Sequence, residues 1–298
     1  MEGRRLDFEA FIRDIESARW RVHGVEVYSD DRLRHSWGDT LDTKYDIYSA
    51  TKSVLSVAVG IAQDMGMIDL ERCVLDYMPA AALDGLSPQQ RDAFRRITLH
   101  RLMTMSVPGF PFRPEGENYL RFALNCPDIR PEAQRFAYGN IPACLTGIAL
   151  QQAVGEDAWA FIRRRVLEPL GIAGAVCARC PEGWFYGASG MKLSVNDLSR
   201  IGRMLCSGGT FDGVRIVSEA YVRKATSALQ DDGHDGYGYL FRRWRDGFSI
   251  NGKWKQRCYV LPRSGLVIAF LSDIREGSEA LIDSMARHLL QDRPVDRT

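Results

Sequence analysis

The chain has 298 residues, of which 45% are hydrophobic and 26% are charged, as is typical of a globular protein. Its 39 basic and 38 acidic residues give a formal net charge of +1. So close a balance provides no electrostatic attraction for nucleic acid or for an anionic membrane surface, and we predict neither as a partner.

The N-terminal segment lacks the pattern of a secretion signal. Its amphipathic stretch contains Asp7, Glu9 and Asp14, whereas a secretion signal needs an apolar segment of about 7–15 residues. Apolar runs such as residues 57–62 are also much shorter than a bilayer span, which needs about 20 residues. We therefore expect a cytoplasmic protein that does not insert into a membrane.

Apolar residues at helical spacing predict an amphipathic helix over residues 6–19. The alternation of residues 24–28 predicts a strand. A turn at residues 29–31 then allows residues 33–37 to return as the second arm of a hairpin. The N-terminal region thus contributes one helix and two antiparallel strands.

The middle of the chain is predicted to be mostly helical. Small and apolar residues dominate residues 51–65, which predicts a helix buried on all sides and ended by Gly66. Prolines punctuate residues 66–175, within which residues 141–154 and 158–166 have clear helical patterns.

The C-terminal third returns to strands after two more helices. The helices are predicted at residues 196–206 and 219–225. Short β-type runs and a last helix follow, at residues 237–243, 248–251, 257–261 and 266–271, and at residues 278–290. Strands at both ends with helices between them predict an α+β fold. Its antiparallel sheet is built from both chain ends, is flanked by helices and is interrupted by a mostly helical insertion.

We assign residues 1–60 and 180–298 to the sheet domain and residues 61–179 to the helical domain. The seven cysteines are an odd number and are scattered, which argues against a disulfide framework. Cys177 and Cys180 form a C-x-x-C, but no second pair follows to complete a zinc site. No phosphate-binding glycine loop or histidine cluster is present either, so we expect no metal and no cofactor.

Ser49 and Lys52 are the first candidates for chemistry, because one helical turn places them on the same face. A serine hydroxyl is a poor nucleophile until a base takes its proton. Burial of the predicted helix and the partial positive charge at its N-terminal end both lower a lysine pKa. Ser189 and Lys192 have the same spacing, but they lie in a glycine-flanked loop where the lysine would stay solvated.

Tyr138-Gly139-Asn140 is the only Y-x-N of the chain. A tyrosine near a buried lysine can have a lowered pKa and pass a proton on. Asn140 offers a donor and an acceptor to a substrate amide or ester, and Gly139 would let both side chains point into a cleft. Judged alone, the three residues also fit a turn with a capping asparagine.

Ile250, Asn251, Gly252 and Lys253 stand where a β-type run ends. Glycine there lets a ligand carbonyl approach the strand edge. The backbone N–H of Lys253 would then form half of an oxyanion hole. Judged locally, a hairpin turn at Asn251-Gly252 is the stronger interpretation.

The three motifs, in this order and at these separations, resemble the serine β-lactamase and penicillin-binding-protein superfamily. The similarity is greatest to its class C and esterase-like branch, which has Y-x-N as the middle motif. Further segments look like landmarks of the family, at residues 48–53, 97–104, 168–171, 188–191 and 208–213. Ser189 falls in one of these structural segments, so Ser49 is the predicted nucleophile.

The resemblance implies an active site in the cleft between the two domains. Ser49 would attack a carbonyl, while Lys52 and Tyr138 move its proton. The N–H groups of Ser49 and Lys253 would stabilise the oxyanion. Asn140 would orient the acyl group, and Tyr138 would then activate the hydrolytic water.

The third motif departs from the family pattern at Ile250, where β-lactamases and D,D-peptidases have a cation that helps to hold the substrate carboxylate. Lys253, Lys255 or Arg257 would have to supply that charge instead. The sequence therefore favours an esterase or amidase that cleaves small uncharged acyl compounds through an acyl-serine. The alternatives are a β-lactamase or D,D-peptidase-like penicillin-binding enzyme, and a catalytically inactive relative that binds a ligand in the cleft.

Overall fold

The computed structural model of the chain describes residues 6–277 and 279–290. A six-stranded antiparallel sheet has the strand order β2-β1-β10-β9-β8-β7. Its strands are β1 (Val22–Ser29), β2 (Arg32–Gly38), β7 (Arg242–Trp244), β8 (Gly247–Gly252), β9 (Gln256–Leu261) and β10 (Leu266–Ser272). N-terminal β1 pairs directly with C-terminal β10, so the prediction of an antiparallel sheet built from both chain ends is confirmed.

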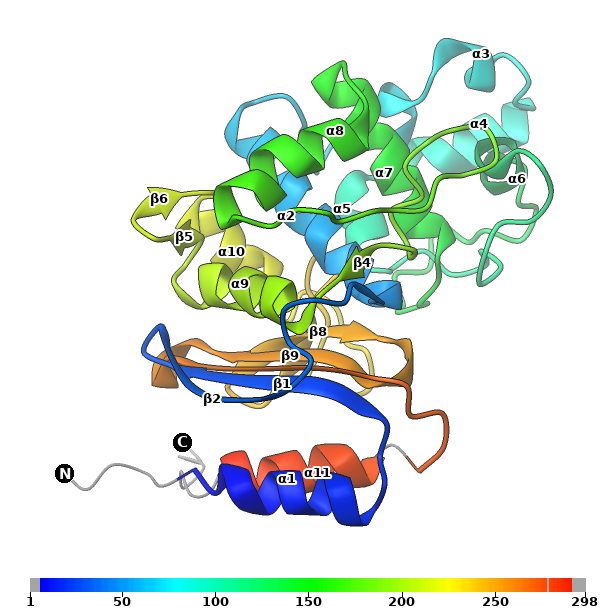
Figure 1. The fold of residues 1–298 in the computed structure, drawn as a ribbon. Coiled ribbons are helices and arrows are strands. Elements are labelled where there is room, and N and C mark those ends of the chain that lie inside the picture. Colours follow the sequence, from blue (N-terminus) through cyan, green and yellow to red (C-terminus); the bar gives the residue numbers. More distant parts are fainter. Residues whose placement is uncertain (1–5, 278, 291–298) are drawn as a thin grey trace, which may run out of the picture.

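One face of the sheet is covered by α1 (Phe8–Ser17) and α11 (Glu279–Leu289), which lie side by side below it in Figure 1. Phe11 and Ile15 of α1 are buried in one apolar cluster with Phe270 of β10 and Met285 of α11. The apolar residues of α1 recur at helical spacing, so they form one apolar stripe, and this stripe faces the sheet.

The opposite face carries α9 (Val195–Cys206) and, above it in Figure 1, the mostly helical middle of the chain. Gly202 of α9 lies so close to the sheet that a Cβ there would be 2.4 Å from Cys258 Sγ. The other helices are α2 (Thr51–Asp64), α3 (Ala80–Leu83), α4 (Pro88–Arg95), α5 (Leu99–Met103), α6 (Tyr119–Leu124), α7 (Ile141–Val154), α8 (Ala158–Ile162) and α10 (Glu219–Ala225). Short strand pairs join β3 (Tyr45–Asp46) to β4 (Lys192–Leu193) and β5 (Thr210–Phe211) to β6 (Val214–Arg215).

Two predicted elements differ from the structure. Of the strand expected at residues 237–243, only β7 (Arg242–Trp244) forms, because Gly238 packs against the Ala225 carbonyl and Leu240 has a φ of 62°. The helix expected at residues 158–166 continues beyond α8 as a π-helical turn, Arg163–Leu167. The predicted domain limits stay a prediction, and residues 1–5, 278 and 291–298 within them lie outside the described residues.

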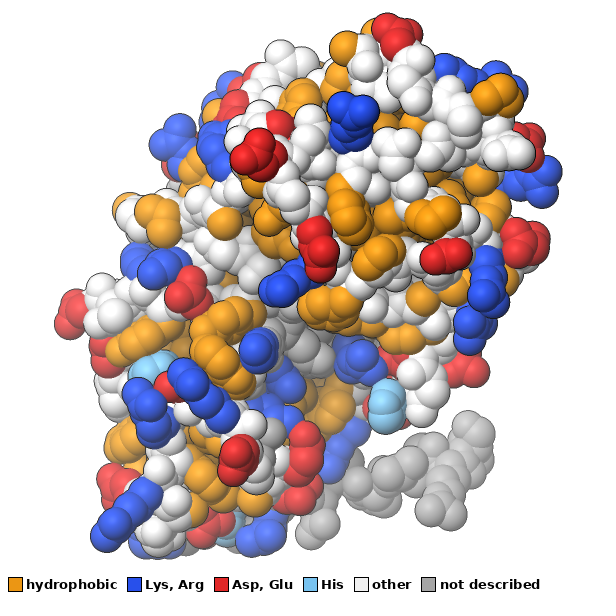
Figure 2. Space-filling view, turned by 90° about the vertical axis from the view of Figure 1, so that its right-hand side faces the viewer, with side chains coloured by type: hydrophobic (Ala, Val, Ile, Leu, Met, Phe, Trp, Pro, Cys, Tyr) orange, Lys and Arg blue, Asp and Glu red, His pale blue; other side chains and the backbone are white. Residues whose placement is uncertain are grey.

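The surface carries both signs of charge, in agreement with the net charge of +1. Figure 2 shows Lys and Arg side chains interspersed with Asp and Glu on the face that it draws. Among the helices in the described ranges, none has the length and apolar character needed to cross a bilayer.

Helix α2 positions the candidate nucleophile and is buried over residues 51–62. A helix that is buried on all sides needs neighbouring elements in close contact. At Gly60, the absence of a side chain lets α10 approach α2. A Cβ at Gly60 would lie 2.4 Å from the ring of Tyr221, whose hydroxyl donates to the carbonyl of Ser56 at 2.8 Å. The α2–α10 contact therefore depends on the missing side chain of Gly60.

Replacement of Gly60 by alanine tests this contact. In an open helix the change stabilises by about 1 kcal/mol, but here the added methyl group collides with a buried ring. We expect a loss of about 1–3 kcal/mol in the free energy of unfolding, measured with urea. The control is Gly85→Ala, where no atom lies within 4 Å of the new Cβ, and equal stabilities of the two variants would contradict the close packing.

Candidate active site

Ser49 lies in a 3₁₀ turn, Tyr48–Ala50, that leads directly into α2. Tyr48 has a φ of 47°, a left-handed conformation that costs a residue with a side chain about 1–2 kcal/mol. Hydrogen bonds on both sides hold this turn. The Ile47 N–H donates to the Met191 carbonyl at 3.0 Å, and the Thr51 hydroxyl donates to the Tyr48 carbonyl at 2.7 Å. Backbone strain of this kind is concentrated at functional sites.

Lys52 is 1% exposed and its Nζ has three acceptors. It lies 3.1 Å from Ser49 Oγ, 2.8 Å from Asn140 Oδ1 and 2.8 Å from the Ala188 carbonyl oxygen. Burial lowers the pKa of Lys52 to about 7, because desolvation penalises the ammonium. The predicted meeting of the Ser49 and Lys52 side chains and the predicted fall in the lysine pKa are both seen here.

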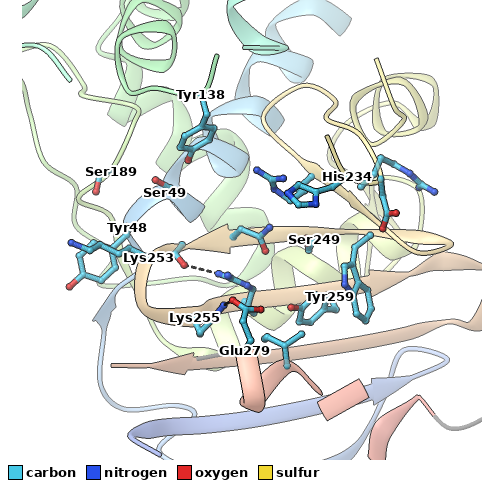
Figure 3. A pocket seen from close by; sticks show the side chains of 18 of the residues that line it. Tyr48, Ser49, Tyr138, Ser189, His234, Ser249, Lys253, Lys255, Tyr259 and Glu279 are labelled. Carbon is cyan, nitrogen blue, oxygen red and sulfur yellow. Dashed lines mark hydrogen bonds and ion pairs between the residues drawn. The ribbon is translucent and has the colours of Figure 1, made fainter. Parts of the chain in front are cut away.

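Tyr138 is partly buried, and its hydroxyl points toward Ser49 in Figure 3. Lys52 Nζ lies 5.1 Å from the centre of its ring. Desolvation raises the pKa of Tyr138, and its hydrogen bond with Ser49 offsets this only in part. The expectation of a lowered tyrosine pKa is therefore wrong. The desolvation that lowers the lysine pKa also penalises a phenolate, and it outweighs the hydrogen bond with Ser49 and the charges of Arg242 and Arg257.

Asn140 is buried at the start of α7, with each end of its amide engaged. Oδ1 accepts from Lys52, and Nδ2 donates to the hydroxyl of Tyr186 at 3.1 Å. Burial raises the pKa of Tyr186 to about 12, so this hydroxyl stays protonated. Sequence reasoning found Asn140 but not Tyr186, because a single tyrosine in a loop carries no spacing signal.

The third motif lies at the end of β8, where β7 no longer covers the strand. Ile250 is fully buried in the core, whereas Asn251, Gly252 and Lys253 line the cavity beside Ser49. Alternation along a strand explains the division, since Ile250 and Asn251 point to opposite faces. The Asn251 Oδ1 is buried without a hydrogen-bond partner in the described structure.

Gly252 is required by a close contact rather than by a turn. It has an extended backbone, with a φ of −123°, and the turn consists instead of Lys253–Lys255. A Cβ at Gly252 would lie 2.2 Å from the Ile47 carbonyl oxygen, next to the nucleophile turn. Gly139, in contrast, has no left-handed φ, and a Cβ there would approach nothing closer than 3.4 Å. The backbone freedom expected of Gly139 is therefore not used.

The three cations proposed to replace a charge at Ile250 all line the cavity, whose volume is about 880 Å³. Lys255 forms an ion pair with Glu279, and Lys253 Nζ lies 4.7 Å from the centre of the Trp254 ring. Arg257 Nη1 donates to the Gly252 and Gln256 carbonyls at 2.7 and 2.9 Å. Positive charge is thus present beside Ser49 although Ile250 is apolar.

The second S-x-x-K pair is separated by the fold. Ser189 lines the same cavity (Figure 3). The side chain of Lys192 is 46% exposed and lies 3.7 Å from Asp46. The Lys192 amine is hydrated and ion-paired, whereas the Lys52 amine beside Ser49 is desolvated.

The two cysteines of the C-x-x-C pair also lie in different surroundings. Cys177 is half-buried, while Cys180 is buried with its Sγ 3.6 Å from Cys144 Sγ. Within residues 6–277 and 279–290, no cluster of three or more His, Cys, Asp or Glu side chains could hold a metal ion. The absence of a metal and of a cofactor stays a prediction.

Comparison with known proteins places this geometry in a family. The model of the Beta-lactamase family matches residues 12–292. This chain belongs to the beta-lactamase family. It is 23% identical over 291 residues to the 6-aminohexanoate-dimer hydrolase of Paenarthrobacter ureafaciens. The match covers 84% of this chain and 71% of that protein.

Solved structures of other proteins share the fold of this chain. FmtA from Staphylococcus aureus is 13% identical with a TM-score of 0.75, and the match covers 97% of this chain and 88% of FmtA. A D-stereospecific amidohydrolase from Streptomyces sp. is 17% identical with a TM-score of 0.69, covering 96% of this chain and 100% of that one. The predicted superfamily and fold class are confirmed.

The pKa values predict how acylation depends on pH. Only the neutral amine of Lys52 could accept a proton from Ser49, so the rate at which a neutral aryl ester acylates Ser49 should rise with pH and level off above about 7. Pre-steady-state bursts measure this rate. Tyr138→Phe should lower the rate but keep the midpoint, because the Tyr138 pKa lies above its ordinary value. A midpoint near 10 that disappears in Tyr138→Phe would contradict this assignment.

Two glycine variants test the contact between β8 and the nucleophile turn. Gly252→Ala should slow acylation of Ser49 by an aryl ester about a hundredfold, because the methyl group collides with the Ile47 carbonyl beside the nucleophile turn. Gly139→Ala, within the second motif, should change activity by less than about threefold, since its Cβ makes only ordinary contacts. Steady-state kinetics at matched folded concentration measure both, and similar losses in the two variants would contradict the structure.

Proposed function

We propose that this protein is a serine hydrolase that cleaves ester or amide bonds of small acyl compounds through a covalent acyl-serine. The observation that carries the proposal is the 3.1 Å contact between Ser49 Oγ and the buried amine of Lys52. A lysine with a pKa of about 7 has a substantial neutral fraction at neutral pH, as a general base requires.

In acylation, Ser49 Oγ bonds to the substrate carbonyl carbon while neutral Lys52 takes the hydroxyl proton. The new ammonium is held by Asn140 Oδ1 and the Ala188 carbonyl, which already lie 2.8 Å from Nζ. The backbone N–H groups of Ser49 and Lys253 stabilise the oxyanion. As the carbonyl re-forms, the bond to the leaving group breaks, and that group receives the proton from Lys52.

The roles of Lys52 and Tyr138 follow from their opposite pKa shifts. Tyr138 remains a neutral hydroxyl, so it acts as a hydrogen-bond donor and proton relay rather than as a phenolate base. In deacylation, Lys52 is the stronger candidate base for the attacking water, and Tyr138 is a hydrogen-bond donor. This reverses the role expected of Tyr138 from the resemblance.

The relatives support the bond type. One is described as a 6-aminohexanoate-dimer hydrolase and another as a D-stereospecific amidohydrolase. Both descriptions are of hydrolases, and the second names an amide substrate. For this chain they support a hydrolytic reaction and an amide bond as one target.

A second candidate function is that of a β-lactamase or D,D-peptidase-like enzyme. The observation that favours it is the positive charge in the cavity. Arg257 lies opposite Asn251 on the neighbouring strand, and Lys253 lies at the end of β8. These cations stand near the third motif, where the family holds a substrate carboxylate, although Ile250 itself is in the core.

A matched pair of variants tests the nucleophile. Ser49→Ala should lower hydrolysis of a chromogenic ester at least about 1,000-fold and abolish the acyl adduct in intact-mass spectra. Ser189→Ala removes the serine of the other S-x-x-K, which lines the same cavity but whose lysine, Lys192, is exposed and ion-paired with Asp46. This control should keep the adduct and most of the activity.

Full activity of Ser49→Ala would overturn the proposed function. The same assay with a chromogenic cephalosporin separates the two candidates. Turnover of the ester with only slow cephalosporin acylation supports the esterase or amidase, whereas rapid cephalosporin turnover supports the second candidate. Failure of both reagents to label Ser49 in the folded protein would indicate an inactive relative that only binds a ligand.

A further inference from the structure

We propose that Arg257 is a positioning residue for the oxyanion hole, because it binds the carbonyl end of the peptide unit whose N–H end faces the reaction. That unit joins Gly252 to Lys253, and Arg257 Nη1 donates to the Gly252 carbonyl at 2.7 Å. The inference rests on the proposed function, in which the Lys253 N–H stabilises the oxyanion.

The position of Arg257 follows from the register of the sheet. It stands on β9 directly opposite Asn251 of β8, so its side chain lies beside the end of the third motif. The same Nη1 also donates to the Gln256 carbonyl at 2.9 Å. Two carbonyl acceptors on one nitrogen hold the guanidinium against the backbone at the point where β8 ends.

Peptide geometry transmits this contact to the reacting group. A trans peptide unit is planar, so its C=O and N–H point in opposite directions and turn together. A donor that holds the Gly252 oxygen therefore sets the direction of the Lys253 N–H. The donor is charged, and charge-assisted hydrogen bonds are about twice as strong as neutral ones. Polarisation along the unit also makes the N–H a stronger donor.

The backbone around this unit would otherwise be easy to rotate. Glycine at position 252 allows more conformations than any other residue, and Trp254 and Lys255 follow with φ values of 57° and 63°. The Ile47 carbonyl confines Gly252 on one side, through the close contact described above. Arg257 confines its carbonyl on the other, so that two contacts fix the N–H beside Ser49.

The experiment compares an uncharged aryl ester with the matching thionoester in the full chain. Sulfur is a weak hydrogen-bond acceptor, so a working oxyanion hole favours the ester. Arg257→Gln should lower kcat on the ester about 10–100-fold and lower the ester-to-thionoester ratio of kcat/KM about tenfold. Arg257→Lys should recover part of the ratio, since an ammonium can donate to the same carbonyl. The uncharged pair removes any effect of Arg257 on an anionic substrate.

Arg243→Gln is the matched control. Arg243 also lines the cavity, but its Nη2 donates to the Arg245 carbonyl and not to the third motif. Its loss should leave the ester-to-thionoester ratio unchanged. Circular dichroism and the urea midpoint establish that each variant is folded, and Arg257→Lys provides a second reading if Arg257→Gln is unstable.

The outcomes separate this inference from the function on which it rests. Equal loss on ester and thionoester in Arg257→Gln, in an enzyme that requires Ser49, would overturn the positioning role alone. An equal change of ratio in Arg243→Gln would do the same. Hydrolysis of the ester at the same rate by the wild type and by Ser49→Ala would overturn the proposed function, and the inference with it.

Discussion

Burial of the Lys52 amine is the constraint on which the rest of this site depends. An ammonium in bulk water would remain protonated near neutral pH and could not activate Ser49. The chain avoids this by placing Lys52 in the first turn of a helix that is enclosed on all sides. The three acceptors around Nζ are uncharged, so they satisfy its hydrogen bonds without restoring its ordinary pKa.

The same desolvation has opposite consequences for the two groups beside Ser49. It lowers the pKa of Lys52 and raises that of Tyr138, because removal from water penalises a charge of either sign. Both pKa shifts are therefore toward the neutral form of the group. One is then an acceptor for a proton and the other a donor of a hydrogen bond, a division of roles that needs no ion pair in the site.

Close backbone contacts bring the remaining parts of the site together. The strained Tyr48 turn and the end of β8 come from opposite ends of the chain, yet Gly252 lies against the Ile47 carbonyl. The rings of Tyr48 and Trp254, both residues with positive φ, also meet edge to face. Strained conformations persist where surrounding contacts over-determine them, and here the contacts join the proposed nucleophile to the proposed oxyanion hole.

The sequence alone determined the sheet from both chain ends, the bounds of α7 and the pairing of Ser49 with Lys52, because periodicity and helical spacing are local properties. Tertiary structure decided the rest: that Tyr138 holds its proton, that Gly252 rather than Gly139 must lack a side chain, and that the Asn140 amide is shared by Lys52 and Tyr186. It also buried Ile250 in the core. These features depend on groups up to hundreds of residues apart, and desolvation and close contact exist only once the folded chain has brought those groups together.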